Sequence, residues 1–258
     1  MTSGRWIELL SNQAKQIAAG NCVLDKCLFD GAPADIAALG AELDNIARAM
    51  VERDRVQKLL THEVHHRVKN SLQIVTSLLN MQVKSLQDPA AKKALGQTRA
   101  RMAALALIHR LIYELGDESA KGHINAATLI AELCKQLKSS STDQPGVALD
   151  CDASDLEIPF DDAVPLALLT VEAVTNAFGH AFPEQRRGKI VVTFAVEEKT
   201  ARLKVVDNGA GFTPAERKTA SMGGQLMVAL AHQLGGTLTI DSSLENGTHV
   251  VLNYALRH

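Results

Sequence analysis

The segment VEAVTNAFGHAF, residues 171–182, carries an acid and an amide at helical spacing. It lies in a stretch that is expected to form a helix from about Asp161 to Gly179, on which Glu172 and Asn176 share one face. An acid and an amide so placed can hold a hydrated magnesium ion against phosphate groups. The same pair is also compatible with a solvated helix face, so other parts of the chain must decide between the two.

A glycine-rich turn downstream offers a place for a flat ring. In DNGAGF, residues 207–212, Asp207 follows an apolar strand pattern. A carboxylate buried at the end of a strand can accept a hydrogen bond from an exocyclic amine, and glycines beside it let the backbone approach a ring closely. Taken alone, the segment would be an ordinary Asp-Asn-Gly turn. The sequence contains no G-x-x-x-x-G-K-[ST] segment, which excludes a P-loop.

The C-terminal half alternates between helical and strand patterns. Its expected helices cover residues 126–137, 161–179 and 225–234, and its expected strands cover residues 147–152, 156–159, 189–197, 201–207, 236–241 and 248–256. A turn is expected at Glu198-Lys199 and a hairpin turn at Glu245-Asn246-Gly247. Helices mixed with strands in this way favour an α/β two-layer sandwich.

Four motifs follow one another in residues 124–258. They read Glu172-x-x-x-Asn176-Ala177-x-x-His180-Ala181-Phe182, Asp207-x-Gly209-x-Gly211, Met222-Gly223-Gly224 and Gly247-Thr248. Their order and their positions on the expected elements resemble the N, G1, G2 and G3 boxes of the Bergerat (GHKL) ATP-binding fold. That fold is shared by gyrases, heat-shock chaperones, mismatch-repair ATPases and histidine kinases. The resemblance implies that the chain uses ATP and Mg²⁺.

The same resemblance implies a role for each motif residue. Asn176 would ligate magnesium, Glu172 would support phosphoryl transfer and Asp207 would bind the adenine amine. The remaining nucleotide contacts would come from His180, Gly209, Gly211, Gly223 and Thr248. Catalysis would then consist of positioning the reactants and neutralising their charge with the metal.

Three positions depart from the pattern of the family. Gly179 stands where the family often has lysine, which removes a cation near the phosphates. Ala220 and Gly224 stand in the segment that usually forms the nucleotide lid with the sequence Gly-Ser-Leu-Gly-Leu. These departures leave open a second hypothesis, a histidine phosphotransferase or pseudokinase with a degenerate ATP site.

The N-terminal half is expected to be helical. Apolar residues at alternating spacings of three and four form a coiled-coil seam: Ile36, Leu39, Leu43, Ile46 and Met50. The seam changes phase near Arg53 and resumes at Val56, Leu60, Val64 and Val68. Asp88-Pro89 predicts the start of another helix, with Met102, Leu105, Ile108, Ile112 and Leu115 on one face. Val56–Leu115 is therefore expected to form an antiparallel hairpin, which buries its stripe in a four-helix bundle when the chain dimerises.

The segment THEVHHRVKN, residues 61–70, has two interpretations. His62, Glu63 and His66 fit His-Glu-x-x-His, the helical signature of zinc proteases. The protease hypothesis needs a third ligand that no downstream motif provides, and it leaves the four ATP-site boxes unexplained. In the second interpretation, one of the histidines carries a phosphoryl group. At 100° per residue, His66 points away from the apolar seam, and Glu63 and Asn70 share its face.

The wider segment resembles the H box of a histidine kinase subfamily. It reads Glu63-x-x-His66-Arg67-x-Lys69-Asn70-x-Leu72-Gln73-x-x-x-Ser77-Leu78-Leu79. The resemblance implies that His66 is the phosphoacceptor and that an aspartate in a response-regulator receiver domain receives the phosphoryl group. Glu63 could orient the imidazole and take its proton, and Asn70 could position a water for dephosphorylation. His62 and His65 stay open as alternatives to His66.

The chain as a whole is expected to be α+β with three domains. These are a HAMP-like helical relay (1–54), a dimerisation and phosphotransfer hairpin (55–117) and an ATP-binding domain (124–258). The relay assignment rests on AKQIAAGN (14–21) and on residues 34–54, for which a plain coiled-coil extension is the alternative. The input would come from a separate sensor or from an upstream part missing from the given chain.

The composition of the chain limits where the protein can be located and what it can bind. The net charge of −2 does not favour nucleic acid as a partner. The four cysteines form no C-x-x-C pair, and no apolar run approaches the length of a membrane span. We therefore expect a cytoplasmic protein, or the cytoplasmic part of a membrane receptor, with reduced thiols.

Overall fold

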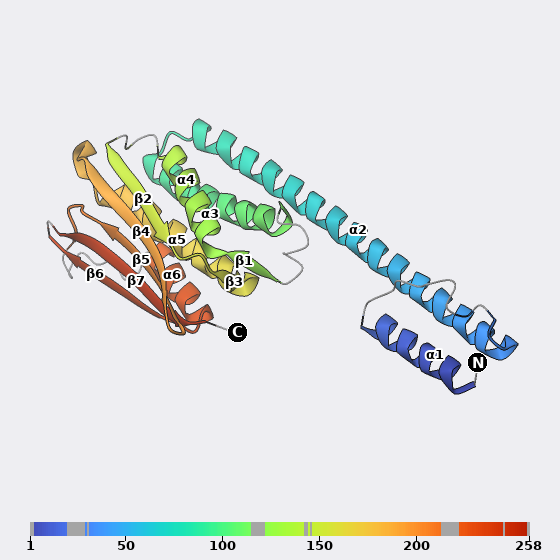
Figure 1. The fold of residues 1–258 in the computed structure, drawn as a ribbon. Coiled ribbons are helices and arrows are strands. Elements are labelled where there is room, and N and C mark those ends of the chain that lie inside the picture. The colour runs from blue at the N-terminus through green and yellow to red at the C-terminus, as the bar shows by residue number, and fades with distance from the viewer. Residues whose placement is uncertain are drawn as a thin grey trace. The chain divides into compact units, whose positions relative to one another are not determined.

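The computed structural model describes residues 3–19, 29, 31–114, 122–141, 144, 146–212, 222–244 and 246–256. The chain divides into two compact units, Met1–Arg67 and Val68–His258. Helix α2 (Ala34–Ser85) continues through the division without a break (Figure 1). The expected change of seam phase near Arg53 and the proposed boundary between residues 54 and 55 therefore both lie inside one continuous helix.

The first unit consists of helices. Helix α1 (Ser3–Ala18) and the first part of α2 run in the same direction (Figure 1). One face of α1 is buried, at spacings of four, three and four residues: Trp6, Leu10, Gln13 and Ile17. In α2, Ala47 is buried, and Gly40 lies so close to the ring of Phe29 that a Cβ there would be 2.8 Å from the ring. Residues 14–18 of the expected relay segment are thus the end of a longer helix that begins at Ser3.

The second unit begins with the rest of α2, followed by helix α3 (Pro89–Glu114). The predicted start of α3 is confirmed, because the Asp88 carboxylate accepts hydrogen bonds from the backbone N–H groups of Ala90 and Ala91 at 3.2 and 3.1 Å. The buried face of α3 comprises Ala104, Leu107, Ile108 and Leu111. This face is shifted from the predicted stripe, since Met102 and Leu105 are only half-buried.

A five-stranded mixed sheet forms the centre of the second unit. Its order is β2 (Val147–Ala153), β4 (Gly188–Glu197), β5 (Thr200–Asp207), β7 (Gly247–Ala255) and β6 (Thr237–Ser243). The β2–β4 pair is parallel and the other pairs are antiparallel. A separate two-stranded sheet pairs β1 (His123–Asn125) with β3 (Glu157–Pro159), and a 3₁₀ turn, η2, covers Pro183–Gln185.

Helices α4 (Ala126–Ser140), α5 (Phe160–His180) and α6 (Met222–Gln233) pack on the sheet (Figure 1). Strands β4 and β5 alternate buried and more exposed residues, as the period-two pattern predicted: Ile190, Val192 and Phe194, then Ala201, Leu203 and Val205, are buried. Helix α5 packs against α3 as well as the sheet, which explains why it is buried along most of its length.

The expected two-layer arrangement of helices on a mixed sheet is confirmed. Helix α4 is capped by Asn125, whose side chain accepts a hydrogen bond from the N–H of Thr128 at 2.9 Å. Strand β1 was not predicted, because it has only three residues and the first of them, His123, ends a polar stretch. Residues 116–121 of that stretch, and Glu245 of the predicted hairpin turn, lie outside the described residues.

None of the helices in the described ranges combines the length and the apolar character that a membrane span requires.

Candidate functional site

The acid and the amide of helix α5 lie next to the start of helix α6. Glu172 is fully buried, with 0% of its surface exposed, and Asn176 is half-buried. A Cβ on Gly223, the second residue of α6, would lie 2.8 Å from Glu172 Oε2 and 3.9 Å from Asn176 Oδ1. A side chain at position 223 would therefore crowd the Glu172 carboxylate and lie in ordinary contact with Asn176. The structure brings together three of the predicted site residues that are separated by up to 51 positions in the sequence.

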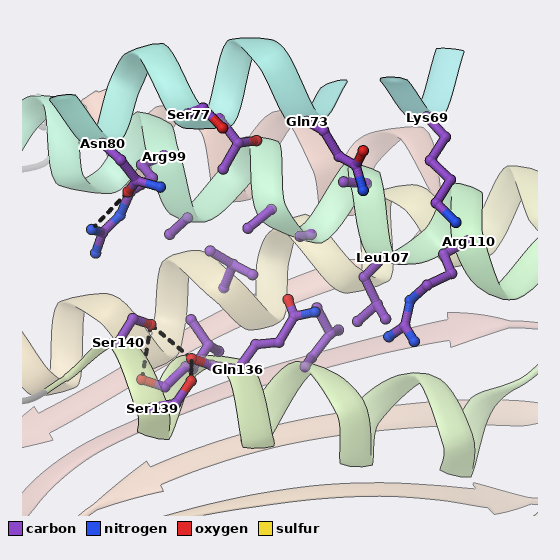
Figure 2. A pocket seen from close by; sticks show the side chains of 18 residues that line it. Lys69, Gln73, Ser77, Asn80, Arg99, Leu107, Arg110, Gln136, Ser139 and Ser140 are labelled. Carbon is purple, nitrogen blue, oxygen red and sulfur yellow. Dashed lines mark hydrogen bonds between the residues drawn. The ribbon is translucent and has the colours of Figure 1, made fainter. Parts of the chain in front are cut away.

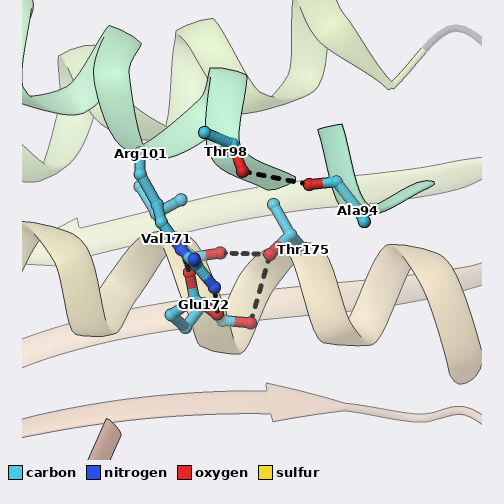
Figure 3. A network of polar contacts seen from close by, with 6 residues as sticks. All are labelled: Ala94, Thr98, Arg101, Val171, Glu172 and Thr175. Carbon is cyan, nitrogen blue, oxygen red and sulfur yellow. Dashed lines mark hydrogen bonds and ion pairs between the residues drawn. The ribbon is translucent and has the colours of Figure 1, made fainter. Parts of the chain in front are cut away.

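The Glu172 carboxylate forms a two-pronged ion pair with Arg101 of helix α3. Arg101 Nε donates to Glu172 Oε1 at 2.5 Å and its Nη2 donates to Oε2 at 3.0 Å (Figure 3). Hydrogen bonding to the carboxylate is the largest influence on the guanidinium and raises the pKa of Arg101. Both carboxylate oxygens are committed to this pair, so a buried charge is compensated where the α3 and α5 helices meet.

The predicted adenine-binding aspartate lies at the end of strand β5. Asp207 is 5% exposed, and its Oδ1 accepts hydrogen bonds from the backbone N–H groups of Gly209 at 2.9 Å and Thr248 at 3.2 Å. Burial raises the pKa of the Asp207 carboxyl, and the two backbone hydrogen bonds offset part of that rise. Since Oδ1 is held by the protein, the carboxylate is fixed in orientation and keeps acceptor capacity for an amine.

Two glycines of the loop after Asp207 make close approaches that a side chain would prevent. A Cβ on Gly209 would overlap the backbone of Ala181, directly after helix α5. Gly211 has a positive φ of 64°, and a Cβ there would overlap the carbonyl oxygen of Ser243. The loop is therefore pressed against the end of α5 on one side and against the β6–β7 hairpin on the other.

Ser242 connects the loop after Asp207 to strand β7 through hydrogen bonds. Its Oγ accepts a hydrogen bond from the N–H of Phe212 at 3.0 Å and donates to the carbonyl of Gly247 at 3.1 Å. The Oγ1 of Thr248, the predicted backing residue for adenine, lies 3.1 Å from the same oxygen. The position of Thr248 beside Asp207 is thus set by the pairing of β5 with β7, in which the two residues face each other.

Helix α3 also reaches the end of helix α5. The ammonium of Lys93 donates to His180 Nε2 at 2.8 Å. Lys93 also lies beside Gly179, where its Cε and Nζ would be 3.5 and 3.6 Å from a Cβ, which is ordinary van der Waals contact. The predicted site residue His180 therefore contacts a lysine from a helix that precedes the ATP-site boxes in the sequence.

The H-box residues lie in helix α2, as predicted. Glu63 and Arg67 are exposed and form an ion pair one turn apart, with Arg67 Nε donating to Glu63 Oε1 at 2.8 Å. An exposed pair of this kind contributes little to stability, so the carboxylate can exchange partners readily. Asn70 is exposed on the same helix. The side chains of His62, His65 and His66 lie outside the described residues, so their orientations stay predictions.

A cavity of about 730 Å³ lies between helices α2, α3 and α4. Figure 2 shows Lys69 and Arg110 at one end of it and Ser139, Ser140 and Asn80 towards the other. None of the residues assigned to the ATP site lines this cavity. It separates the polar face of α2 from the ATP-binding domain.

The side chains around Asn176 offer few ligands for a magnesium ion. Its amide supplies an oxygen ligand of the kind that Mg²⁺ accepts, whereas Glu172 has both oxygens on Arg101. Among the described residues, no three His, Cys, Asp or Glu side chains gather closely enough to hold a metal by themselves. The residues fit a magnesium ion that is bound together with nucleotide phosphates and water.

Three residues of this region were missed in the sequence. Arg101 and Lys93 belong to α3 and contact α5 over sequence separations of 71 and 87 residues. Ser242 lies one residue beyond the expected strand of residues 236–241, and none of the four boxes includes it. Local spacing carries no signal for such contacts.

Of the departures from the family pattern, Gly224 lies in helix α6 and Ala220 falls outside the described residues.

Two family models match the chain. The family described as "Histidine kinase" matches residues 63–141, and the family described as "Histidine kinase-, DNA gyrase B-, and HSP90-like ATPase" matches residues 161–258. The first match begins at Glu63 and contains the H box, and the second contains the four ATP-site boxes. The match to a histidine kinase replaces the protease interpretation of residues 61–70.

Curated relatives agree with these matches. The chain is 28% identical over 210 residues to the sensor histidine kinase PdtaS of Mycobacterium tuberculosis, covering 80% of this chain and 40% of that protein. It is 26% identical to the sensor histidine kinase LiaS of Bacillus subtilis, covering 77% of this chain and 52% of that protein. The chain thus spans about half or less of the length of these relatives.

A solved structure shares the fold. The histidine kinase domain of the blue-light activated histidine kinase EL346 of Erythrobacter litoralis superposes with a TM-score of 0.58 at 23% identity, covering 76% of this chain and 92% of that one. Residues 63–141 and 161–258 therefore match the two families named above, which together with the curated relatives support histidine kinase activity, a transferase activity.

Proposed function

We propose that the chain is an ATP-dependent protein autokinase that phosphorylates His66 and passes the phosphoryl group to an aspartate of a response-regulator receiver domain. The observation that carries this proposal is the position of Asp207. It is a buried carboxylate held by the N–H groups of Gly209 and Thr248, next to loops that only glycine allows to pack so closely. This arrangement supports recognition of an adenine amine, and it argues against a degenerate ATP site.

The proposed reaction is an in-line phosphoryl transfer. An imidazole nitrogen of His66 forms a bond to the γ-phosphorus, the bond to the β,γ-bridging oxygen breaks, and ADP leaves. Glu63 lies one turn before His66. Its carboxylate leaves Arg67, contacts the imidazole of His66 and accepts the imidazole proton. Asn176 would hold Mg²⁺, which supplies charge neutralisation to the phosphates when it is bound. Asn70 would orient a water that removes the phosphoryl group.

A second copy of the chain is the proposed partner of the hairpin. Within the second unit, helix α2 presents its polar face to the cavity, through Lys69, Gln73 and Ser77. Its apolar face is exposed: Val68, Ile74, Val75, Leu78 and Met81. An uncovered apolar stripe on a long helix favours association. A homodimer that packs these faces together as a four-helix bundle would bury the stripe, as the histidine kinase relatives suggest in general terms.

The proposed input to the kinase comes through residues 1–54. The parallel course of α1 and the first part of α2, together with the buried face of α1, supports a helical relay of the HAMP type over a plain coiled-coil extension. The signal would arrive from a separate sensor or from a part of a longer protein, and the enzyme would work in the cytoplasm.

The proposal is tested by incubating the chain with γ-³²P-labelled ATP and magnesium. We expect incorporation of a label that is labile in acid and stable in alkali, and loss of that label to a receiver domain whose aspartate is intact. A receiver domain with that aspartate changed to asparagine is the control. If the chain binds no ATP yet exchanges phosphoryl groups with a phosphorylated receiver domain, the phosphotransferase hypothesis replaces the kinase.

A further inference from the structure

Helix α3 carries two cations that contact the N-box helix at matching intervals. Lys93 and Arg101 lie eight residues apart on α3, and their partners His180 and Glu172 lie eight residues apart on α5. Eight residues of α-helix span about 12 Å. The two helices therefore run antiparallel, and the cations of α3 bracket Asn176 of α5, which lies midway between their two partners.

The two cations differ in how their charge is compensated. Arg101 is neutralised by Glu172 through two hydrogen bonds. Lys93 has an imidazole as its partner, and in the described part of the chain no carboxylate lies within ion-pair distance of its ammonium. Partial burial lowers the pKa of Lys93, because it disfavours the charged form. An anion placed beside it would remove this cost.

The surroundings of Lys93 belong to the nucleotide site. Its ammonium lies beside Gly179 and His180, within one turn of Asn176. The next residue of the chain, Ala181, accepts a hydrogen bond from the N–H of Ala210 at 2.8 Å, so the loop after Asp207 is fastened to the same end of α5. Lys93 thus lies where the N-box helix meets the glycine-rich loop.

We propose that Lys93 is a nucleotide-binding residue that contacts the phosphates of ATP, supplying from α3 the cation that position 179 of the ATP-binding domain lacks. The position of the Lys93 ammonium beside Gly179 and on His180, with no carboxylate partner among the described residues, carries the assignment. This inference rests on the proposed function, because it requires the site to bind ATP. It makes nucleotide affinity depend on the contact between α3 and α5.

A merely structural role for Lys93 predicts a different result. A cation near the C-terminal end of α5 also interacts favourably with the helix dipole. If that were its only role, replacing Lys93 would change the stability of the chain but would affect the binding of a nucleotide and of a nucleoside equally. A phosphate contact weakens binding only for ligands that carry phosphates.

The test is calorimetric titration of the full chain with magnesium-ADP and with adenosine. We expect Lys93→Met to weaken ADP binding about tenfold, as for loss of one charged hydrogen bond, and to leave adenosine binding unchanged. Lys92→Met is the matched control, since Lys92 is exposed on the same helix, and it should bind both ligands like the unmodified chain. Adding Gly179→Lys to Lys93→Met should restore ADP affinity to within about twofold, because a side chain at 179 meets only ordinary contacts.

The inference is overturned if Lys93→Met binds ADP as tightly as the unmodified chain, if it loses ADP and adenosine affinity equally, or if Gly179→Lys recovers nothing. Each of these results leaves the proposed kinase function intact, provided that the unmodified chain binds ADP. Absence of ADP and ATP binding in the unmodified chain would instead remove the proposed function and the inference together.

Discussion

The ion pair between Arg101 and Glu172 allows a quantitative prediction about stability. Replacing Arg101 by methionine leaves the carboxylate of Glu172 buried without its partner. The Glu172 side chain is 0% exposed and that of Arg101 is 20% exposed, so water cannot take over the lost contacts. Breaking a buried pair by removing one member costs about 3–5 kcal/mol. For a domain of this size, this lowers the melting temperature by roughly 10 °C.

The assay is urea unfolding monitored by circular dichroism. The urea concentrations at the midpoint are compared for variants in which the free energy of unfolding depends equally steeply on urea concentration. The control is Lys189→Met, which breaks an exposed pair with Asp150 at 2.8 Å on the same unit and should cost less than about 1 kcal/mol. The double variant Arg101→Met/Glu172→Met replaces the pair by apolar side chains and should recover most of the loss.

The reasoning is refuted if Arg101→Met unfolds within about 1 kcal/mol of the unmodified chain, the range of an exposed pair. It is also refuted if the double variant is as unstable as the single one, because the cost would then not arise from an unpaired buried carboxylate.

Three other predictions concern single side chains. Because the pKa of Asp207 is raised by burial, its ionisation opposes folding: the penalty is absent below the usual aspartate value of 3.8 and complete above the raised value. Asp207→Asn keeps the Oδ1 acceptor, so at pH 7 its melting temperature should equal or exceed that of the unmodified chain while ATP affinity falls in calorimetry; marked destabilisation would contradict this. Burial raises the pKa of Cys134 to about 12, so iodoacetamide at pH 8 should label exposed Cys151 and spare Cys134 in the folded chain; mass spectrometry showing equal labelling would be inconsistent with the structure. Asn70→Ala should retain the phosphoryl label several-fold longer in a pulse-chase experiment than the unmodified chain, and an unchanged half-life would remove the proposed role of Asn70.

The sequence predicted those parts of the site that depend on local spacing. Glu172 and Asn176 share a helix face, and Asp207 ends a strand before a glycine-rich turn, so periodicity and turn chemistry were sufficient to place them. The order of the four ATP-site boxes then indicated the resemblance to known families. The two matching family models bear out this resemblance at the level of the two domains.

The contacts between elements could not be predicted in this way. Arg101 and Lys93 reach α5 from a helix more than 70 residues earlier, and nothing in their neighbourhood distinguishes them from Arg99 or Lys92. The buried face of α3 differs in part from the predicted stripe for the same reason. The stripe was predicted from the spacing of apolar residues, which does not show that part of the helix packs against α4 and α5.

The identity of the phosphoacceptor is the central claim, and site-specific labelling tests it most directly. The full chain and three variants, His62→Gln, His65→Gln and His66→Gln, are incubated with γ-³²P-labelled ATP and magnesium, and acid-labile label is measured on folded protein. We expect His66→Gln to carry no label, while His62→Gln and His65→Gln are labelled to within about twofold of the unmodified chain. Full labelling of His66→Gln, or loss of label only in His62→Gln or His65→Gln, would contradict the assignment of His66.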